Sequence, residues 1–233
     1  LHSTAETMTP PPHSAGHRAR LRARLLEAGP SALAEHELLE LLLATAIPRR
    51  DTKKQAWALL KRFGSLARVL DAPAAELGKI GGVGPAAIGA LKVVKAVAGA
   101  YLTEPLRGAD VLTTPKAVFD YCRVAFGGTP DETVHALLLD SGNRLKRAVQ
   151  LSRGTIDQSQ VYPRRVVEEA IAARAKGVIL VHNHPSGRRE PSAADERLTR
   201  DVSSALTTID ATLLDHVIVG EAGTFSFREA GRL

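Results

Sequence analysis

Residues 178–187 have the sequence VILVHNHPSG, and residues 191–195 have the sequence PSAAD. The apolar run predicts a buried strand that ends at Pro185, which cannot continue a strand ladder. Alternate residues of a strand point to the same side, so His182 and His184 present two imidazoles to one point at the strand tip. Asp195 lies at the start of the next expected helix, where the intervening loop can fold its carboxylate back toward the two imidazoles.

Two histidines and one carboxylate form a ligand set that leaves a fourth tetrahedral position open, as in catalytic zinc sites. Hydrolysis at such a site needs a carboxylate that takes a proton from water and a donor that stabilises an oxyanion. Glu132 precedes an apolar strand expected at 134–139, which places it at the edge of the same sheet. The hydroxyl of Ser192 can point into the site.

These residues also have purely structural interpretations. The spacing of Ser192 and Asp195 fits a helix capping box, and Asp195 could not fully serve both the cap and a metal. Glu132 could be a solvated residue before a strand. His216, next to Asp215, is expected to be a structural histidine or to lie behind the ligands, and His135 is expected to face solvent.

The chain outside this stretch divides into four parts. Residues 1–17 are rich in Pro, Ser and Thr and are expected to be a disordered leader. Residues 18–102 have helical periodicity, and residues 103–113 have the polar, proline-containing character of a linker. Residues 114–233 are expected to form an α/β domain with a mixed sheet, with helices at 115–126, 163–175 and 192–206 and strands at 134–139, 145–151, 178–181, 212–219 and 224–227.

A glycine-rich turn lies inside the helical part, where residues 77–85 have the sequence LGKIGGVGP. Gly82 and Gly84 bracket an apolar residue, and Pro85 suits the first position of the following helix. The segment resembles the hairpin of helix-hairpin-helix motifs, which bind the nucleic-acid backbone without reading sequence. The alternative is a turn whose glycines serve close packing only, since Lys79, Lys92 and Lys95 are the only nearby cations.

Composition limits the class of protein. With 233 residues, 44% apolar and 24% charged, the chain is expected to be a two-domain globular protein of the cytoplasm, without a signal peptide or membrane contact. The single cysteine, Cys122, is expected to be a small buried hydrophobe, so any metal must be held by histidine and carboxylate.

The net charge of +6 lies in the N-terminal part of the chain. Residues 1–107 contain 15 Lys and Arg against 9 Asp and Glu, whereas residues 108–233 contain 16 against 16. A polyanionic partner such as DNA would therefore bind the N-terminal part, although solvated helix faces account for the excess equally well.

The motif His182-x-His184-Pro185 with Ser192-x-x-Asp195 resembles the JAMM (MPN+) metalloprotease signature. The sequence HNHPSG at 182–187, the Gly-Thr pair at 154–155 and Leu-Asp-His at 214–216 resemble the bacterial RadC family over residues 18–233. The resemblance implies a JAB/MPN-type α/β domain in which His182, His184 and Asp195 bind Zn²⁺, Glu132 is the general base and Ser192 stabilises the oxyanion. The chain departs from the family pattern at 188–189, where two arginines replace the usual acidic residue and proline.

Two functions from different classes follow. The first is a zinc-dependent hydrolase of JAMM type that cleaves a peptide or isopeptide bond in a protein or peptide substrate. The alternative is a DNA-binding protein of repair or recombination, the role that the family name implies, whose metal domain is a scaffold or a nuclease. A nuclease is the less favoured form, because paired metals on phosphodiesters use more carboxylates than one Asp and one Glu. The sequence predicts no oligomeric state.

Overall fold

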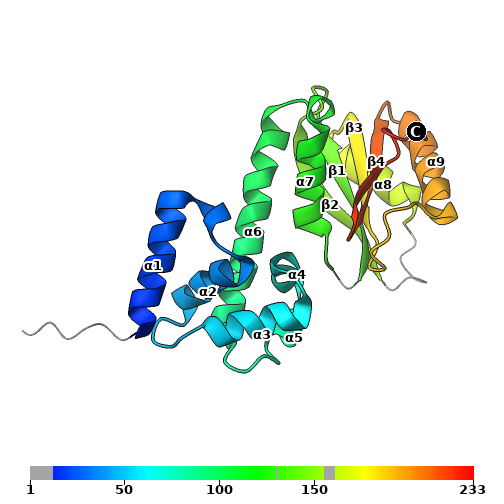
Figure 1. Ribbon diagram of the computed structural model, residues 1–233. Helices are drawn as coiled ribbons and strands as arrows, with labels where there is room; N and C mark the ends of the chain where they lie inside the picture. Colours follow the sequence, from blue (N-terminus) through cyan, green and yellow to red (C-terminus); the bar gives the residue numbers. More distant parts are fainter. Residues whose placement is uncertain (1–12, 130, 155–160) are drawn as a thin grey trace, which may run out of the picture. The chain divides into compact units, whose positions relative to one another are not determined.

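The computed structural model describes residues 13–129, 131–154 and 161–233 (Figure 1). Residues 1–12 of the expected leader and Thr155 of the RadC-like Gly-Thr pair therefore lie outside the described residues. The chain divides into two compact units, and the division falls between Val93 and Val94, inside a long helix. Each unit is described by itself.

The first unit is helical, as the periodicity predicts. Its buried core is formed by leucines such as Leu39, Leu43 and Leu59, which have no exposed surface. The elements are α1 (His13–Ala28), η1 (Pro30–Ala32), α2 (Glu35–Ala46), α3 (Lys53–Phe63), α4 (Leu66–Asp71), α5 (Ala74–Leu77) and α6 (Pro85–Gly108).

The first helix begins earlier than expected, at His13 instead of after residue 17. Residues 13–17 belong to the first turns of α1 rather than to a disordered segment. A tertiary contact explains the difference, because Nε2 of His17 lies 3.2 Å from Oε1 of Glu40, a carboxylate that is 1% exposed in α2. Local composition could not reveal that pairing.

The expected linker at 103–113 is also largely helical. The helix α6 continues to Gly108, with Pro105 inside its last turn, and η2 (Val111–Thr113) follows. Leu106 is fully buried in the core of the second unit, with Leu102 packed against the same core, so burial of these side chains extends the helix beyond the point where composition changes.

The helix α6 is apolar over most of its length. Among the described helices it is the one long and apolar enough to cross a membrane, although Lys92 and Lys95 lie in its middle. A single such helix is a weak indication of a membrane span, and Leu91 and Leu106 contribute to the cores of the two units.

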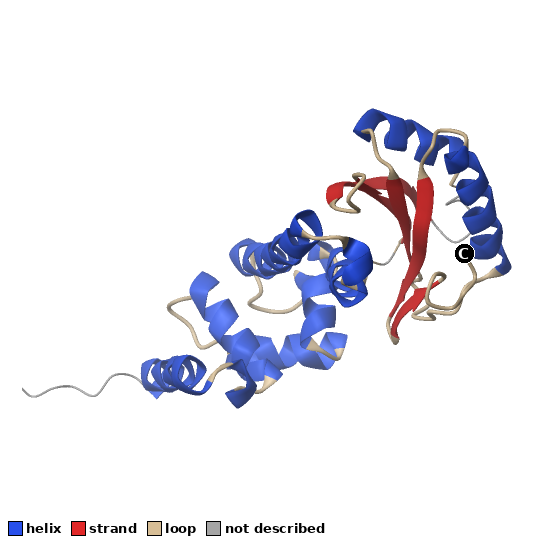
Figure 2. Ribbon diagram, turned by 90° about the horizontal axis from the view of Figure 1, so that it is seen from above, coloured by secondary structure: helices blue, strands red, loops and turns tan. Residues whose placement is uncertain are grey.

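The second unit is an α/β fold with three layers (Figures 1 and 2). Its five-stranded sheet has the order β2-β1-β3-β4-β5, in which β3 and β4 are parallel and the other neighbours are antiparallel. The expected mixed α/β architecture is therefore confirmed. The elements are α7 (Pro115–Phe126), β1 (Glu132–Leu139), β2 (Leu145–Gly154), α8 (Pro163–Ala173), β3 (Gly177–Asn183), α9 (Ala193–Thr207), β4 (Thr212–Gly220) and β5 (Gly223–Ser226).

The central strand β3 is buried along its whole length because helices cover both faces of the sheet. Ile179 and Val181 pack in the core beneath α7, whereas Val178 and Leu180 pack in the core beneath α8 and α9. By the same alternation, His182 falls on the side of α8 and α9.

The structure corrects one expectation and confirms another. His135 does not face solvent: it is half-buried, its ring lies 4.1 Å from that of Phe126 in α7, and burial lowers its pKa to about 4. Cys122 is fully buried in α7, as expected for a small hydrophobe, and burial raises the pKa of its thiol far above the ordinary value.

The turn between α5 and α6 has the expected glycine geometry at one position. Gly82 has φ +84°, and Val83 is buried. The cations named as nearby have other partners: Lys79 pairs with Glu76, and Lys92 donates to the carbonyls of Leu70 and Ala72. Lys95 donates to the Gly127 carbonyl.

Replacing Gly82 with Ala should destabilise the first unit by about 1–3 kcal/mol, because an L side chain is strained at positive φ and its Cβ would lie 2.5 Å from Nε2 of Gln55. Gly84→Ala is the matched control: a Cβ there meets no atom within 4 Å, so the change should stay within about 0.5 kcal/mol. Urea unfolding measures both variants, and equal losses would show that packing against Gln55 is not the constraint.

Candidate metal centre

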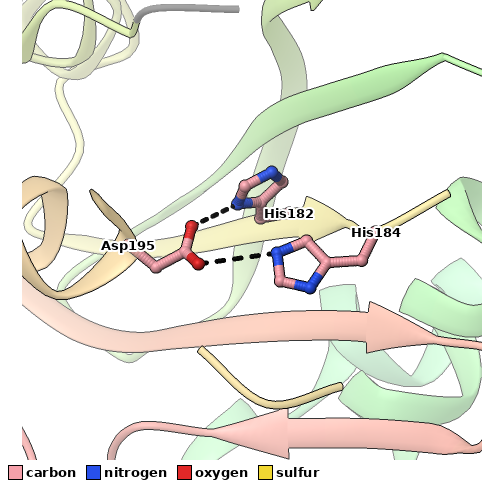
Figure 3. Close-up of side chains that lie close together, drawn as sticks. All are labelled: His182, His184 and Asp195. Carbon is pink, nitrogen blue, oxygen red and sulfur yellow. Dashed lines mark ion pairs between the residues drawn. The ribbon is translucent and has the colours of Figure 1, made fainter. Parts of the chain in front are cut away.

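Three side chains meet at the tip of β3. His182 is the second-last residue of β3, and His184 directly follows the strand. Asp195 is in the first turn of α9 (Figure 3). One ligand atom from each lies within 4.8 Å of the other two. The structure therefore brings together the residues that the strand alternation and the loop length place at one point.

The distances suit a small divalent cation. Nδ1 of His182 lies 2.8 Å from Oδ1 of Asp195, and Nε2 of His184 lies 3.5 Å from Oδ2 of the same carboxylate. Ligands at 2.0–2.1 Å from a tetrahedral zinc ion lie about 3.3 Å from one another. The two measured distances bracket that spacing.

One nitrogen of the cluster is buried without a hydrogen-bond partner. Nδ1 of His182 is close to Asp195, but the two groups are not aligned as a hydrogen bond. An unsatisfied buried polar atom is costly in a folded protein. A cation between the imidazole and the carboxylate would satisfy it, so these residues fit a metal ion.

The imidazole of His184 is oriented by the loop that follows it. Its Nδ1 donates a hydrogen bond of 3.0 Å to the carbonyl of Arg188, and its Nε2 faces Asp195. The loop is held against the β4–β5 turn, where the Glu221 amide donates to the Gly187 carbonyl. Because Arg188 acts here through its backbone, an arginine in place of an acidic residue leaves this contact intact.

Asp195 caps its helix and also faces the histidines. The sequence analysis treats these as competing roles for one carboxylate. Its Oδ2 accepts from the Ser192 amide at 2.7 Å and from the Ser192 hydroxyl at 2.6 Å. Its Oδ1 faces His182. The carboxylate therefore caps α9 through Oδ2, which also lies 3.5 Å from Nε2 of His184, while Oδ1 faces His182.

Glu132 lies beside this cluster and is not a freely solvated residue. It is the first residue of β1, and its Oε1 is 2.8 Å from Nε2 of His182. The pairing of β1 with β3 places Val134 opposite His182, which brings the start of β1 to the strand tip. The five residues singled out from the sequence thus form one continuous group.

Asn183 is a residue that the sequence analysis missed. Its side-chain oxygen accepts from the amide and hydroxyl of Thr133, and its side-chain nitrogen donates to the Thr129 hydroxyl and the Asp131 carbonyl. It thereby fixes the backbone on both sides of Glu132. Its position between His182 and His184 at the end of an apolar strand is the feature of the sequence that could have identified it as part of the site.

A second buried network lies behind the ligands, as expected for His216. Nδ1 of His216 is 2.8 Å from the Thr199 hydroxyl, which donates to the Asp195 carbonyl at 2.6 Å. Burial lowers the pKa of His216 to about 3, so its imidazole is neutral. Asp215 is structural: its carboxylate accepts from the Ser226 hydroxyl and the Arg228 amide.

The charges at the centre are strongly coupled. Burial alone lowers the pKa of His182, but the carboxylates of Asp195 and Glu132 outweigh burial and raise it to about 9. Burial acts to raise the pKa of Asp195, yet the adjacent imidazoles of His182 and His184 and the hydrogen bond from the Ser192 hydroxyl hold it far below its ordinary value. Without a metal, a proton on His182 balances part of the negative charge.

A cleft of about 910 Å³ opens onto these residues. One wall is the first turns of α9, another is the start of α8, where Tyr162 is 63% exposed, and a third is the loop after β3. The volume is within the range of sites that hold small ligands or a short peptide segment. Its lining includes Glu132, Val134, Val161, Tyr162, His182, His184, Arg188, Glu190, Ser192, Asp195, Arg197, Leu198 and Asp201.

A mixed sheet between helical layers, with a His-His-Asp cluster at the tip of its central strand, defines the class of JAB-domain α/β proteins. Residues 112–232 match the family model described as RadC-like JAB domain, and residues 14–88 match the one described as UPF0758 N-terminal. The chain belongs to this RadC-like family, also called UPF0758.

Several relatives match most of the chain. A UPF0758 protein of Aromatoleum aromaticum is 46% identical over 92% of this chain and 96% of its own length. A UPF0758 protein of Methylibium petroleiphilum is 44% identical over 92% of this chain and 96% of its own length. One of Burkholderia mallei is 42% identical over 90% of this chain and 76% of its own.

The metal-free protein should lose stability as the pH rises from about 7 to above 9. The folded-state pKa of His182 lies above its unfolded value of about 6.5, so its contribution is complete below that value and is lost as the pH rises through about 9. The loss is on the order of 3 kcal/mol. Urea unfolding of chelator-treated protein at both pH values measures it. If the free energy of unfolding of His182→Gln fell by the same amount over this pH range, the loss could not be due to His182.

Asn183→Ala should reduce the free energy of unfolding by about 2–4 kcal/mol, because it leaves the Thr133 amide and the Asp131 carbonyl without their partner in a buried position. Gln150→Ala removes an amide that is exposed in β2 and should change it by less than about 0.5 kcal/mol. Urea midpoints compare the two variants. A small effect at Asn183 would mean that the strand ladder alone holds the start of β1.

Proposed function

We propose that the chain is a zinc-dependent hydrolase of JAMM type that cleaves a peptide or isopeptide bond. The observation that carries the proposal is the buried convergence of His182, His184 and Asp195, with a nitrogen of His182 that has no hydrogen-bond partner. Three protein ligands leave a coordination position open, which is the arrangement of catalytic rather than structural zinc. When bound, the ion would supply Lewis-acid polarisation of the carbonyl and of water.

Glu132 is proposed as the general base. It is 17% exposed and lines the same cleft as the His-His-Asp cluster, and its Oε1 lies 2.8 Å from Nε2 of His182, the ring nitrogen that does not face Asp195. It would take a proton from the attacking water and deliver it to the nitrogen of the leaving amine as the carbon–nitrogen bond breaks.

Ser192 is proposed as the donor that stabilises negative charge on the substrate carbonyl oxygen. Its hydroxyl, at the N-cap of α9 in the lining of the cleft, donates to Asp195 Oδ2 and would exchange that acceptor for the substrate oxygen. Ser192 is the N-cap of α9, and the N-terminus of a helix favours negative charge. A protein or peptide substrate would enter through the cleft, where Tyr162 and Leu198 supply apolar contact.

Purified protein should contain about one zinc ion per chain, and the double variant His182→Ala, His184→Ala should contain none, because removal of two of three ligands leaves only a carboxylate. Elemental analysis after dialysis measures the content. Arg164→Ala together with Arg200→Ala, two exposed changes in the same unit, is the control for handling losses. Equal metal in the ligand variant and the wild type would refute the zinc assignment.

Glu132→Gln should reduce the rate of hydrolysis by a factor of about 10²–10⁴ while zinc stays bound. The amide keeps the size of the side chain but cannot accept the proton. Glu190→Gln, in the same cleft, is the matched control and should retain most activity. Turnover of a fluorogenic peptide and isopeptide panel measures the effect. Retained activity in Glu132→Gln would show that another group is the base.

A further inference from the structure

The proposed hydrolase uses none of the charge of the first unit, and α3 carries a concentrated part of it. Lys53, Lys54, Trp57 and Lys61 lie on one side of this helix, within an arc of about 100°. All four are exposed, whereas Ala56 and Leu59, on the other side, are fully buried. These four residues are called the α3 face.

The lysines of the α3 face have no acidic partner among the described residues. Two other cations of the first unit are paired, Arg24 with Glu37 at 2.9 Å and Arg62 with Glu76 at 3.3 Å. Arg20 and Arg22 of α1 are exposed and form no ion pair in the part of the chain that the structure describes. Lys53 and Lys54 lie in the first turn of α3, where positive charge is unfavourable to the helix. Local stability therefore does not explain their presence.

Further positive charge lies next to the α3 face. Arg49 and Arg50 are exposed just before α3, and no ion pair joins either side chain to an acid in the described part of the chain. Residues 13–93 together contain 13 Lys and Arg against 7 Asp and Glu. The unit as a whole thus attracts polyanions, and five of its cations that have no acidic partner within the described ranges lie on or next to the α3 face.

Trp57 lies in the middle of the lysines and is 51% exposed. Its ring is stacked on that of His36 from α2, with centroids 4.4 Å apart, which holds the indole in place. Half of the residue remains open to solvent. A fixed, exposed aromatic ring flanked by cations combines a stacking surface with a charge complementary to phosphate.

We propose that the α3 face binds single-stranded nucleic acid, with a base stacked on Trp57 and the flanking phosphates on Lys53, Lys54 and Lys61. A single strand fits better than a duplex, because duplex bases are stacked on one another and do not offer a face to an external ring. The binding is independent of sequence, since every base has such a face. It does not depend on the proposed hydrolase, which lies in the other unit.

The test uses the full-length protein, in which Trp57 is the single tryptophan. Addition of oligo-dT or oligo-rU of about 15 nucleotides at low salt should quench its fluorescence, and added salt should reverse the quenching. The His182→Ala, His184→Ala variant should show the same quenching, which separates this surface from the metal centre. Unchanged Trp57 fluorescence with both oligonucleotides would overturn the proposal.

Variants are compared by the fluorescence anisotropy of a labelled oligonucleotide. Trp57→Ala should weaken binding by roughly 5- to 100-fold, and Trp57→Phe should lie between it and the wild type. The triple change of Lys53, Lys54 and Lys61 to Ala should reduce the slope of log affinity against log salt by about 2. The matched control changes Lys116, Arg164 and Arg200 of the second unit to Ala; these are 66–88% exposed and should have little effect.

Three other outcomes would contradict the proposal. Equal weakening in the control triple variant would mean that only net charge matters. Equal affinity for duplex DNA, with no effect of Trp57→Ala, would show that bases are not contacted. Equally tight binding of polyglutamate, without fluorescence quenching by the oligonucleotides, would identify an acidic polypeptide as the better partner.

Discussion

The second unit depends on one electrostatic constraint, the burial of an imidazole between two carboxylates. His182 contacts both Asp195 and Glu132 at 2.8 Å, and all three side chains are largely removed from water. Two negative charges in such a place need positive charge. A proton on His182 supplies it, and a divalent cation held at the proposed site would supply more. The nitrogen of His182 that lacks a hydrogen-bond partner faces Asp195, where such a cation would lie.

The fold builds this constraint from the ends of its elements. The chain leaves the tip of β3, crosses in α9 over one face of the sheet and returns in the parallel strand β4. This crossover sets the first turn of α9, with Asp195, above the end of the strand that carries His182. Glu132 comes from the neighbouring antiparallel strand β1, whose start is tied to the same tip by Asn183. Ligands commonly bind at such carboxyl ends of parallel strands.

The two units differ in how their charged side chains are paired. The second unit holds a buried, hydrogen-bonded site whose carboxylates are matched by histidines. The first unit holds the excess of unpaired cations, and the ones named as near its glycine turn are engaged with Glu76 or with backbone carbonyls. A group of exposed lysines without an acidic partner among the described residues lies instead on α3, around an exposed tryptophan. The absence of acidic partners in the described part of the chain, rather than the glycine motif, is therefore what favours α3 as the surface proposed to bind nucleic acid.

The sequence by itself determined the helical first part, the mixed α/β second part and the convergence of His182, His184 and Asp195. Strand alternation and helix periodicity are local properties, so they can be read from neighbouring residues. Tertiary structure decided where α1 begins and where α6 ends, because the partners of His17 and Leu106 are distant in the chain. It also decided that Asp195 both caps α9 and faces the histidines, since only the folded geometry shows which way each carboxylate oxygen points.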